Sequence, residues 1–363
     1  MPPLLLHVFD GFRVGGTEIR TCNIINYLKG RFRHIVVSNN GNFEAARHVD
    51  KGINIKYVNF AARHPFYPLI LAKIARVLRT VSPDLIIAYE WGAIDWAIAS
   101  ILFCSVSVLM TVEGFEESEL FVQKRKRLLV RKVLYPKCSK VVVCSSKLFD
   151  IARNQWRIPQ NRLIHIPNGV DCKRFQPRPK TVAGNDDVKL GIVASLIKLK
   201  NHIGLLKSLN QLSENHNWKL FVAGDGPERE NLEQYCKKQG LTNRVHFMGH
   251  VNDTPRFLKD LDVFCLASIT EQMPVSILEA MAVGLPIVST DVGDVKQMVS
   301  EGNKPFIVPV GDRSEYVKAL QRLIEDKTLR LKIGDANRRK CIKEYDEELM
   351  FKRYEDLYTS LIS

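Results

Sequence analysis

The chain has 363 residues, which exceeds what one hydrophobic core usually serves and predicts two domains. Its content of 45% hydrophobic and 25% charged residues is normal for a globular protein. Its eight scattered cysteines include no C-x-x-C pair, which argues against a zinc site or disulfide framework and favours a reducing compartment. The net charge of +14 resides in the first half, where residues 1–180 hold 28 Lys and Arg against 13 Asp and Glu, while residues 181–363 hold 25 against 26.

Short β-branched runs alternate with helical stretches, which predicts parallel sheets covered by helices on both faces. In the first half the expected strands are residues 4–9, 33–38, 53–58, 84–89, 106–112, 140–145 and 163–167. In the second half they are residues 189–194, 218–224, 245–248, 262–267, 286–289 and 306–309. Residues 172–187 are rich in Pro, Gly and charge and are the natural linker. We expect two doubly wound α/β domains, residues 1–172 and 188–345, facing a cleft at the carboxyl ends of their strands.

The first expected strand is followed by Gly15 and Gly16, which open a helix. Two glycines let the backbone approach a ligand closely and present amides at a helix start. A tight turn is an equally good interpretation of these two residues alone.

No cationic leader with a cleavable apolar core opens the chain. The longest apolar stretch, residues 97–112, contains three serines and is shorter than the roughly 20 residues of a membrane span. We expect a buried helix followed by a strand there.

Residues 123–137 form the most basic segment of the chain. Apolar residues recur in it at helical spacing among many cations: Leu128, Leu129, Val133 and Leu134 among Lys124, Arg125, Lys126, Arg127, Arg131 and Lys132. Such a helix can lie on an anionic membrane surface, each nearby cation contributing about 1 kcal/mol, although a solvated helix face is the alternative. Nucleic acid is not an expected partner, because no recognition fold or aromatic-interleaved basic strand is present.

Two carboxylates, Glu271 and Glu279, lie around a helix start within residues 268–293. Pro274 has the fixed φ that suits a first helical turn, and Gly284 supplies the helix stop before the strand PIVS. The free amides and the helix dipole at such a start suit a phosphate, and a carboxylate on either side can hold sugar hydroxyls.

This segment resembles the Glu-x7-Glu motif of the retaining glycosyltransferases of family 4, which have the two-domain GT-B fold. The spacing, the proline, the EAMA tetrapeptide, the Gly-x-Pro and the following strand agree together. The segments IPNGVDCKRF (residues 166–175), FVAGDGPERENL (221–232) and RVHFMGHV (244–251) extend the likeness. In that family a C-terminal helix, here about residues 346–363, commonly packs back onto the first domain.

The resemblance implies a role for each matching residue. Glu271 would hold the donor hexose, Glu279 the ribose, and Lys200 the donor diphosphate, whose charge grows as the sugar leaves. The segment IPNGVD would form a hinge. The remaining donor-binding residues implied are Gly15, Gly16, Ser195, Gly224, Gly226, Gln272, Met273, Pro274, Val275 and Ser276.

Two positions depart from the family pattern. Ser195 stands where the family usually carries an Arg, so one phosphate-neutralising cation is replaced by a hydroxyl, for which Lys198 is a candidate substitute. Glu113 stands where many members have a His near the reacting carbon; it is a candidate catalytic residue, against the alternative of an unrelated loop carboxylate.

By this resemblance we expect a retaining hexosyltransferase that uses a nucleotide-diphosphate sugar as co-substrate and needs no metal or other cofactor. The basic helix favours a lipid-linked or membrane-associated glycan acceptor in surface polysaccharide assembly, with the protein in the cytoplasm and peripheral at the inner face of the cell membrane. A soluble sugar or protein acceptor is the other possibility. A catalytically silent nucleotide-sugar-binding protein is the alternative function, motivated by Ser195 and Glu113.

Overall fold

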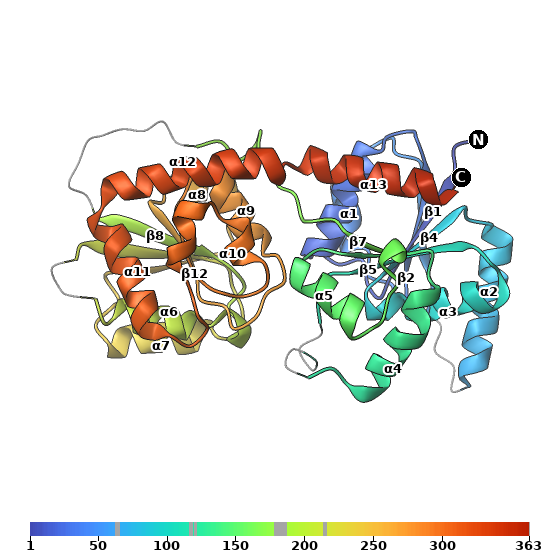
Figure 1. Cartoon of the computed structure of the whole chain (residues 1–363), viewed down its shortest axis with the longest axis horizontal. Helices are drawn as coiled ribbons and strands as arrows, with labels where there is room; N and C mark the ends of the chain where they lie inside the picture. The colour runs from blue at the N-terminus through green and yellow to red at the C-terminus, as the bar shows by residue number, and fades with distance from the viewer. Residues whose placement is uncertain (62–65, 116–118, 120–121, 178–186, 213–215, 363) are drawn as a thin grey trace. The chain divides into compact units, whose positions relative to one another are not determined.

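The computed structural model describes every residue except 62–65, 116–118, 120–121, 178–186, 213–215 and 363 (Figure 1). The chain divides into two compact units, residues 1–167 with 350–363 and residues 168–349. The expected linker, residues 172–187, lies outside the described residues over 178–186, and its first residues belong to the second unit.

The first unit is built on a seven-stranded parallel sheet in the order β3-β2-β1-β4-β5-β6-β7. Its strands are β1 Leu4–Phe9, β2 Arg33–Ser38, β3 Ile55–Asn59, β4 Leu85–Tyr89, β5 Ser107–Val112, β6 Lys140–Val143 and β7 Leu163–His165. All seven predicted strands are confirmed. Chain order reverses beside β1, which pairs with β2 on one side and β4 on the other.

Helices cover both faces of this sheet, and successive residues of its strands therefore point into two different cores. Leu6 and Val8 of β1 pack in one core with the helices α2 Tyr67–Val81, α3 Ile94–Phe103, α4 Arg125–Leu134 and α5 Ser146–Asn154. Leu5 and Phe9 pack in the other core with α1 Gly16–Tyr27 and with the part of α13 Glu347–Ile362 that begins at Met350. This double burial explains why the strands read as continuous apolar runs.

The second unit is built on a six-stranded parallel sheet in the order β10-β9-β8-β11-β12-β13. Its strands are β8 Val188–Val193, β9 Trp218–Ala223, β10 Val245–Gly249, β11 Val263–Leu266, β12 Ile287–Thr290 and β13 Ile307–Val308. Its helices are α6 His202–Leu209, α7 Arg229–Lys238, α8 Thr254–Lys259, α9 Val275–Ala282, α10 Val295–Met298, α11 Arg313–Glu325 and α12 Lys327–Glu344. These six strands were also predicted, so the α/β class with two doubly wound sheets is confirmed.

Each sheet has a point at which its strand order reverses, between β1 and β4 in the first unit and between β8 and β11 in the second. Open parallel sheets bind ligands beside such a point, at the carboxyl ends of the strands. The loops there carry most of the predicted site residues.

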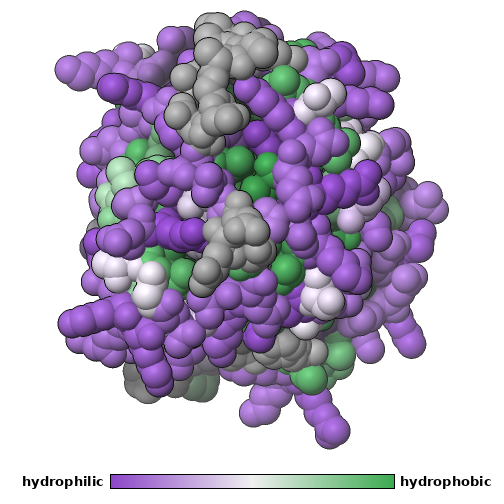
Figure 2. Space-filling model, turned by 90° about the vertical axis from the view of Figure 1, so that its left-hand side faces the viewer, coloured by the Kyte–Doolittle hydropathy of each residue, from purple (hydrophilic) through white to green (hydrophobic). Residues whose placement is uncertain are grey.

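The face drawn in Figure 2 is mainly hydrophilic, and the hydrophobic residues visible on it form small separate areas.

Candidate active site

The start of α9 has the geometry that the sequence predicts, with one shift. Pro274 is the residue before the helix, at φ −67° and ψ 117°, and Val275 is the first helical residue. Gly284 has the positive φ of 80° expected of a helix stop. The first amides of a helix have no partner within it, so those of Val275 and Ser276 are suited to donate hydrogen bonds to a phosphate.

Lys200 and Glu271, which lie 71 residues apart in sequence, form an ion pair with 2.5 Å between Nζ and Oε1. Lys200 ends a 3-10 helix, η6 Lys198–Lys200, after β8, and Glu271 follows β11, so the two meet where strand order reverses. Ser268 Oγ donates to the same Glu271 oxygen at 2.8 Å. The side chains are 25% and 12% exposed, which leaves both accessible to a ligand.

Gly224 and Gly226 bring the loop after β9 against the loop after β8. A Cβ on Gly224 would lie 2.0 Å from the carbonyl oxygen of Ala194, and one on Gly226 would lie 2.6 Å from that of Leu196. Their φ values of 139° and 159° also favour glycine. Contact with the protein's own backbone therefore already requires both glycines. Ser195, predicted beside the donor, is exposed in this pair of loops.

Glu279 lies in the second turn of α9, partly buried, and its carboxylate has no hydrogen-bond partner among the described residues. Burial raises the pKa of Glu279 to about 7, against which the guanidinium of Arg174 acts in the opposite direction. A buried carboxyl without a partner is poorly solvated, so hydroxyl groups of a ligand would stabilise its charged form. No hydrogen bond or ion pair links Glu279 to Lys200 or Glu271.

The segment IPNGVD does more than form a turn. Asn168 Nδ2 donates to the carbonyl oxygen of Met273 at 3.0 Å, and the Asn168 amide lies 3.1 Å from the Met273 sulfur. On the other side, the Asp294 amide donates to the Gln272 carbonyl at 2.8 Å, and a Cβ on Gly293 would lie 2.0 Å from that oxygen. The backbone before α9 is thus held from two sides, a function of Asn168 that sequence reasoning missed.

In the first unit, Gly15 precedes α1, and a Cβ on it would lie 2.6 Å from a carboxyl oxygen of Glu18. A Cβ on Gly16 meets nothing within 4 Å. Packing within the described part of the chain therefore does not demand glycine at position 16, which leaves room for the close approach of a ligand.

Glu113 follows β5, and its carboxylate accepts hydrogen bonds from both terminal nitrogens of Arg20, a residue of α1. The distance between Arg20 Nη1 and Glu113 Oε2 is 2.7 Å. Arg20 is 9% exposed and Glu113 17%. Arg20 was not predicted, although it lies in the same helix that Gly15 and Gly16 open. Its guanidinium gives the carboxylate a fixed orientation that no sequence pattern indicates.

The basic segment is only partly the surface that the sequence predicts. Arg127 and Arg131 both bind Glu119, with 2.9 Å to Oε2 in each case, and Arg131 has a buried side chain. Counting these two as membrane-facing cations is therefore wrong. Burial by itself would raise the pKa of Glu119, but the hydrogen bonds from Arg131 and Arg127 outweigh it and lower this pKa to about 2. Lys124, Arg125 and Lys126 remain exposed, as do the side chains of Val122, Leu129 and Val133.

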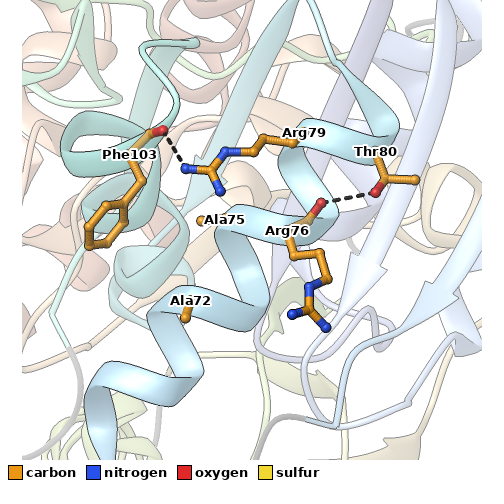
Figure 3. Close-up of a pocket in the computed structure, with 6 residues that line it drawn as sticks. All are labelled: Ala72, Ala75, Arg76, Arg79, Thr80 and Phe103. Carbon is orange, nitrogen blue, oxygen red and sulfur yellow. Dashed lines mark hydrogen bonds between the residues drawn. The ribbon is translucent and has the colours of Figure 1, made fainter.

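A pocket of about 400 Å³ lies between α2 and α3 of the first unit, and none of the residues that line it is a predicted site residue. Arg79 reaches across it to donate to the Phe103 carbonyl at 3.2 Å, whereas Arg76 extends to the other side of α2 (Figure 3). The guanidinium that crosses the hollow is thus already bonded to the protein.

Across the ranges that the structure describes, no three His, Cys, Asp or Glu side chains are grouped so that they could hold a metal ion. Within those same ranges, no helix combines the length and the apolar character that crossing a membrane requires.

Two family models match the chain, and together they extend from residue 14 to residue 340. Residues 14–174 match Glycosyltransferase Family 4, and residues 173–340 match Glycosyl transferases group 1. The junction between them lies close to the division between the two units of the structure.

Relatives and solved structures agree with these models. An uncharacterized glycosyltransferase of Haemophilus influenzae is 26% identical over 331 residues, which cover 89% of this chain and 91% of the relative. The UDP-Gal:alpha-D-GlcNAc-diphosphoundecaprenol alpha-1,3-galactosyltransferase of Escherichia coli is 26% identical over 274 residues, 70% of this chain and 69% of the relative. The Anabaena protein HepE, solved with UDP and glucose, superposes with a TM-score of 0.82 at 20% identity and covers 99% of this chain and all of its own. Matching models over both units and a shared GT-B fold lead to one conclusion: the chain belongs to glycosyltransferase family 4, group 1, and is a glycosyltransferase of the GT-B type.

Proposed function

We propose that the protein transfers a hexose from a nucleotide-diphosphate sugar to a hydroxyl of a lipid-linked or membrane-associated glycan, with retention of anomeric configuration. The observation that carries this proposal is the Lys200–Glu271 pair near the reversal point of the second sheet. The second unit would hold the donor and the first unit the acceptor.

The chemistry follows from charge. As the sugar leaves, negative charge grows on the diphosphate, and an ammonium group with helix-start amides stabilises it most in the transition state. Lys200 and the amides of Val275 and Ser276 would serve this purpose. Glu271, held by Ser268, would accept hydrogen bonds from the hexose hydroxyls. The acceptor hydroxyl would attack on the face that the phosphate leaves and pass its proton to that phosphate.

Because the protein's own cations balance the diphosphate, we expect transfer to continue without a metal. Activity that survives an excess of chelator is the expected result. Loss of activity that added magnesium or manganese restores would contradict it.

The acceptor class has two lines of support. The Escherichia coli relative acts, by its name, on a sugar carried by diphosphoundecaprenol. The first unit also exposes Lys124, Arg125 and Lys126 beside Leu129 and Val133, which are 63% and 55% exposed. Exposed apolar residues next to cations suit an anionic bilayer surface. We therefore place the protein in the cytoplasm, peripheral at the inner face of the membrane.

A donor panel tests the activity. UDP-, GDP- and ADP-hexoses are supplied with a GlcNAc-diphosphate lipid, and transfer is measured for the wild type and for Glu271→Ala. We expect one nucleotide class to support transfer and Glu271→Ala to reduce kcat at least 100-fold with the fold intact. Glu301→Ala, which removes a carboxylate that is 83% exposed in the same unit, is the control and should behave as wild type. Full activity of Glu271→Ala would overturn the assignment.

Vesicle binding tests the membrane surface. Replacing Lys124, Arg125 and Lys126 with Gln should weaken binding to vesicles with anionic lipid by at least tenfold. The matched control replaces Lys51, Lys56 and Lys352, three exposed cations elsewhere in the first unit, and should bind as wild type. Equal loss in both variants would show that net charge, and not this surface, controls binding.

A silent binding protein is the second candidate, because Ser195 replaces an expected cation and Arg20 neutralises Glu113. It predicts that a nucleotide sugar binds without turnover for every donor and acceptor mixture. A Ser195→Arg variant that gains transfer activity would support this reading of the wild type.

A further inference from the structure

Glu90, the residue that follows β4, has a backbone conformation that is unusual for a side-chain-bearing residue. Its φ of 58° and ψ of −167° fall in a region occupied almost only by glycine. The Glu90 amide donates to the Thr111 carbonyl at 3.0 Å. Two residues later, Gly92 packs so closely on Asp10, the residue after β1, that a Cβ there would lie 2.4 Å from the Cβ of Asp10. The backbone is thus held on both sides of this residue, and a glycine at position 90 would adopt the same conformation without strain. Strain of this kind concentrates at functional sites.

The Glu90 carboxyl lies beside the predicted site residue of the first unit. Its Oε1 accepts a hydrogen bond from the Glu113 amide at 2.6 Å. Its second oxygen has no hydrogen-bond partner among the described residues, and the residue as a whole is only partly buried. Glu90 follows β4 and Glu113 follows β5, so both lie at the carboxyl edge of the sheet, beside the reversal of strand order.

The groups that face this carboxyl come from four places: Glu113 after β5, Arg20 from α1, Arg131 from α4, and Tyr135 from the 3-10 helix Tyr135–Lys137. Arg20 and Arg131 are bound to Glu113 and Glu119. Burial first, and the neighbouring Glu113 carboxylate second, raise the pKa of Glu90 to about 8. At neutral pH Glu90 is therefore largely a neutral acid, which has an O–H group to donate.

We propose that Glu90 is an acceptor-binding residue: its neutral carboxyl, fixed at one oxygen by the Glu113 amide, donates a hydrogen bond from the other oxygen to a hydroxyl of the acceptor glycan. A carboxylate at this position could only accept, and it would add a second negative charge beside Glu113. The neutral acid instead offers a donor next to the acceptor groups of the Arg20–Glu113 pair. A sugar hydroxyl both donates and accepts, so it fits this combination. The inference rests on the proposed function, because it requires an acceptor in the first unit.

Two variants separate this role from a structural one. Glu90→Gln keeps an oxygen for the Glu113 amide and an N–H donor for the ligand but cannot ionise. Glu90→Gly removes the side chain and relieves the backbone. Ser105→Gly is the control, since it relieves a φ of 55° at an exposed position before β5, away from the carboxyl edge.

The measurements are acceptor KM with octyl-diphosphate GlcNAc, donor hydrolysis without acceptor, binding of the same lipid by calorimetry, and melting temperature. We expect Glu90→Gly to raise acceptor KM and the lipid Kd at least tenfold, with donor hydrolysis within twofold of wild type and no drop in melting temperature. Wild-type acceptor KM should rise severalfold between pH 7 and pH 9, and Glu90→Gln should lack that rise. Ser105→Gly should leave KM unchanged.

Unchanged acceptor KM in Glu90→Gly overturns the proposal, as does a pH dependence that persists in Glu90→Gln. A parallel fall of donor hydrolysis and melting temperature in Glu90→Gly indicates a structural role and also overturns it. Failure of the proposed function looks different: the wild type then turns over no donor. Absence of lipid binding by the wild type overturns the acceptor assignment of Glu90 directly.

Discussion

At the scale of single residues, the pairing of Lys200 with Glu271 changes how either substitution should be interpreted. Each group neutralises the other, so removing one leaves a partly buried charge without its partner. A loss of activity in Glu271→Ala therefore combines a missing hexose contact with a displaced Lys200. Comparing it with Glu271→Gln, which keeps the shape and a carbonyl oxygen, separates the two effects.

Glu279 gives a pH-dependent prediction. Because burial raises the pKa of Glu279 to about 7, its carboxylate is mostly charged at pH 8 and mostly protonated at pH 6. The charged form accepts hydrogen bonds from ribose hydroxyls, whereas the protonated form loses part of that capacity. We expect the Kd for UDP to rise up to about tenfold as pH falls from 8 to 6, by calorimetry. UDP itself also takes up protons in this range, so Glu279→Gln is the reference; an identical pH dependence in this variant would contradict the assignment.

At the scale of elements, α4 shows why an amphipathic pattern overstates a charged surface. The sequence places seven cations along residues 123–137, yet Glu119 from the preceding segment draws Arg127 and Arg131 inward. Arg131 also lies over the rings of Trp91, Phe115 and Trp156. The helix is thus anchored by part of the charge that was expected to face the membrane.

Glu119→Gln should destabilise the first unit by about 3–5 kcal/mol at pH 7, because two partly or fully buried guanidinium groups lose their carboxylate. The pKa of Glu119 is lowered to about 2, so its contribution is present above the unfolded value near 4.5 and is lost as pH falls toward 2. Urea denaturation monitored by tryptophan fluorescence, at pH 7 and at lower pH, measures the loss of stability and its pH dependence. Asp150→Asn, in an exposed pair with Arg153, should cost less than about 1 kcal/mol. Equal costs would show that Glu119 is not the anchor.

At the scale of the whole molecule, the sheet of the first unit contains a buried, hydrogen-bonded row of three rings: Tyr89 of β4, His7 of β1 and His34 of β2. His7 Nδ1 lies 3.1 Å from the Tyr89 hydroxyl, and His7 Nε2 lies 3.1 Å from His34 Nδ1. Burial, and then the proximity of His34, lower the pKa of His7 well below its ordinary value, and burial lowers the pKa of His34 to about 4. Both rings are therefore neutral in the folded unit at physiological pH.

The sign of the consequence follows from linkage. Unfolded histidines take up protons near pH 6.5, whereas these two do so in the fold only at much lower pH, so they make the fold less stable as pH falls from about 6.5 to 4. In an NMR titration, the rings of His7 and His34 should keep neutral-form shifts at least down to pH 5. A ring that titrates near pH 6.5 in the folded protein would contradict this, and His34→Gln should reduce the acid sensitivity of unfolding.

Much of the fold could be predicted because it depends on periodicity. The thirteen strands in the described part of the chain were all predicted from short apolar runs, and Gly284 ends α9 as its position indicates. Around the candidate site, the predicted helix start is confirmed, and the structure brings together Lys200 and Glu271, which the sequence named by family resemblance. Their role in donor binding stays a prediction. The sequence also named Gly224 and Gly226, but their close packing on the loop after β8 appears only in the structure.

Local pattern, in short runs of residues, determined the strands, the helix starts and the membership in a glycosyltransferase family, because each of these is encoded over neighbouring positions. The tertiary structure alone decided which charges meet: Lys200 with Glu271, Arg20 with Glu113, and Arg131 with Glu119. It also decided that Glu90 is strained and bonded to the Glu113 amide. Parallel strands bring residues that are tens of positions apart to one sheet edge, and no periodicity in the sequence records which of them will touch.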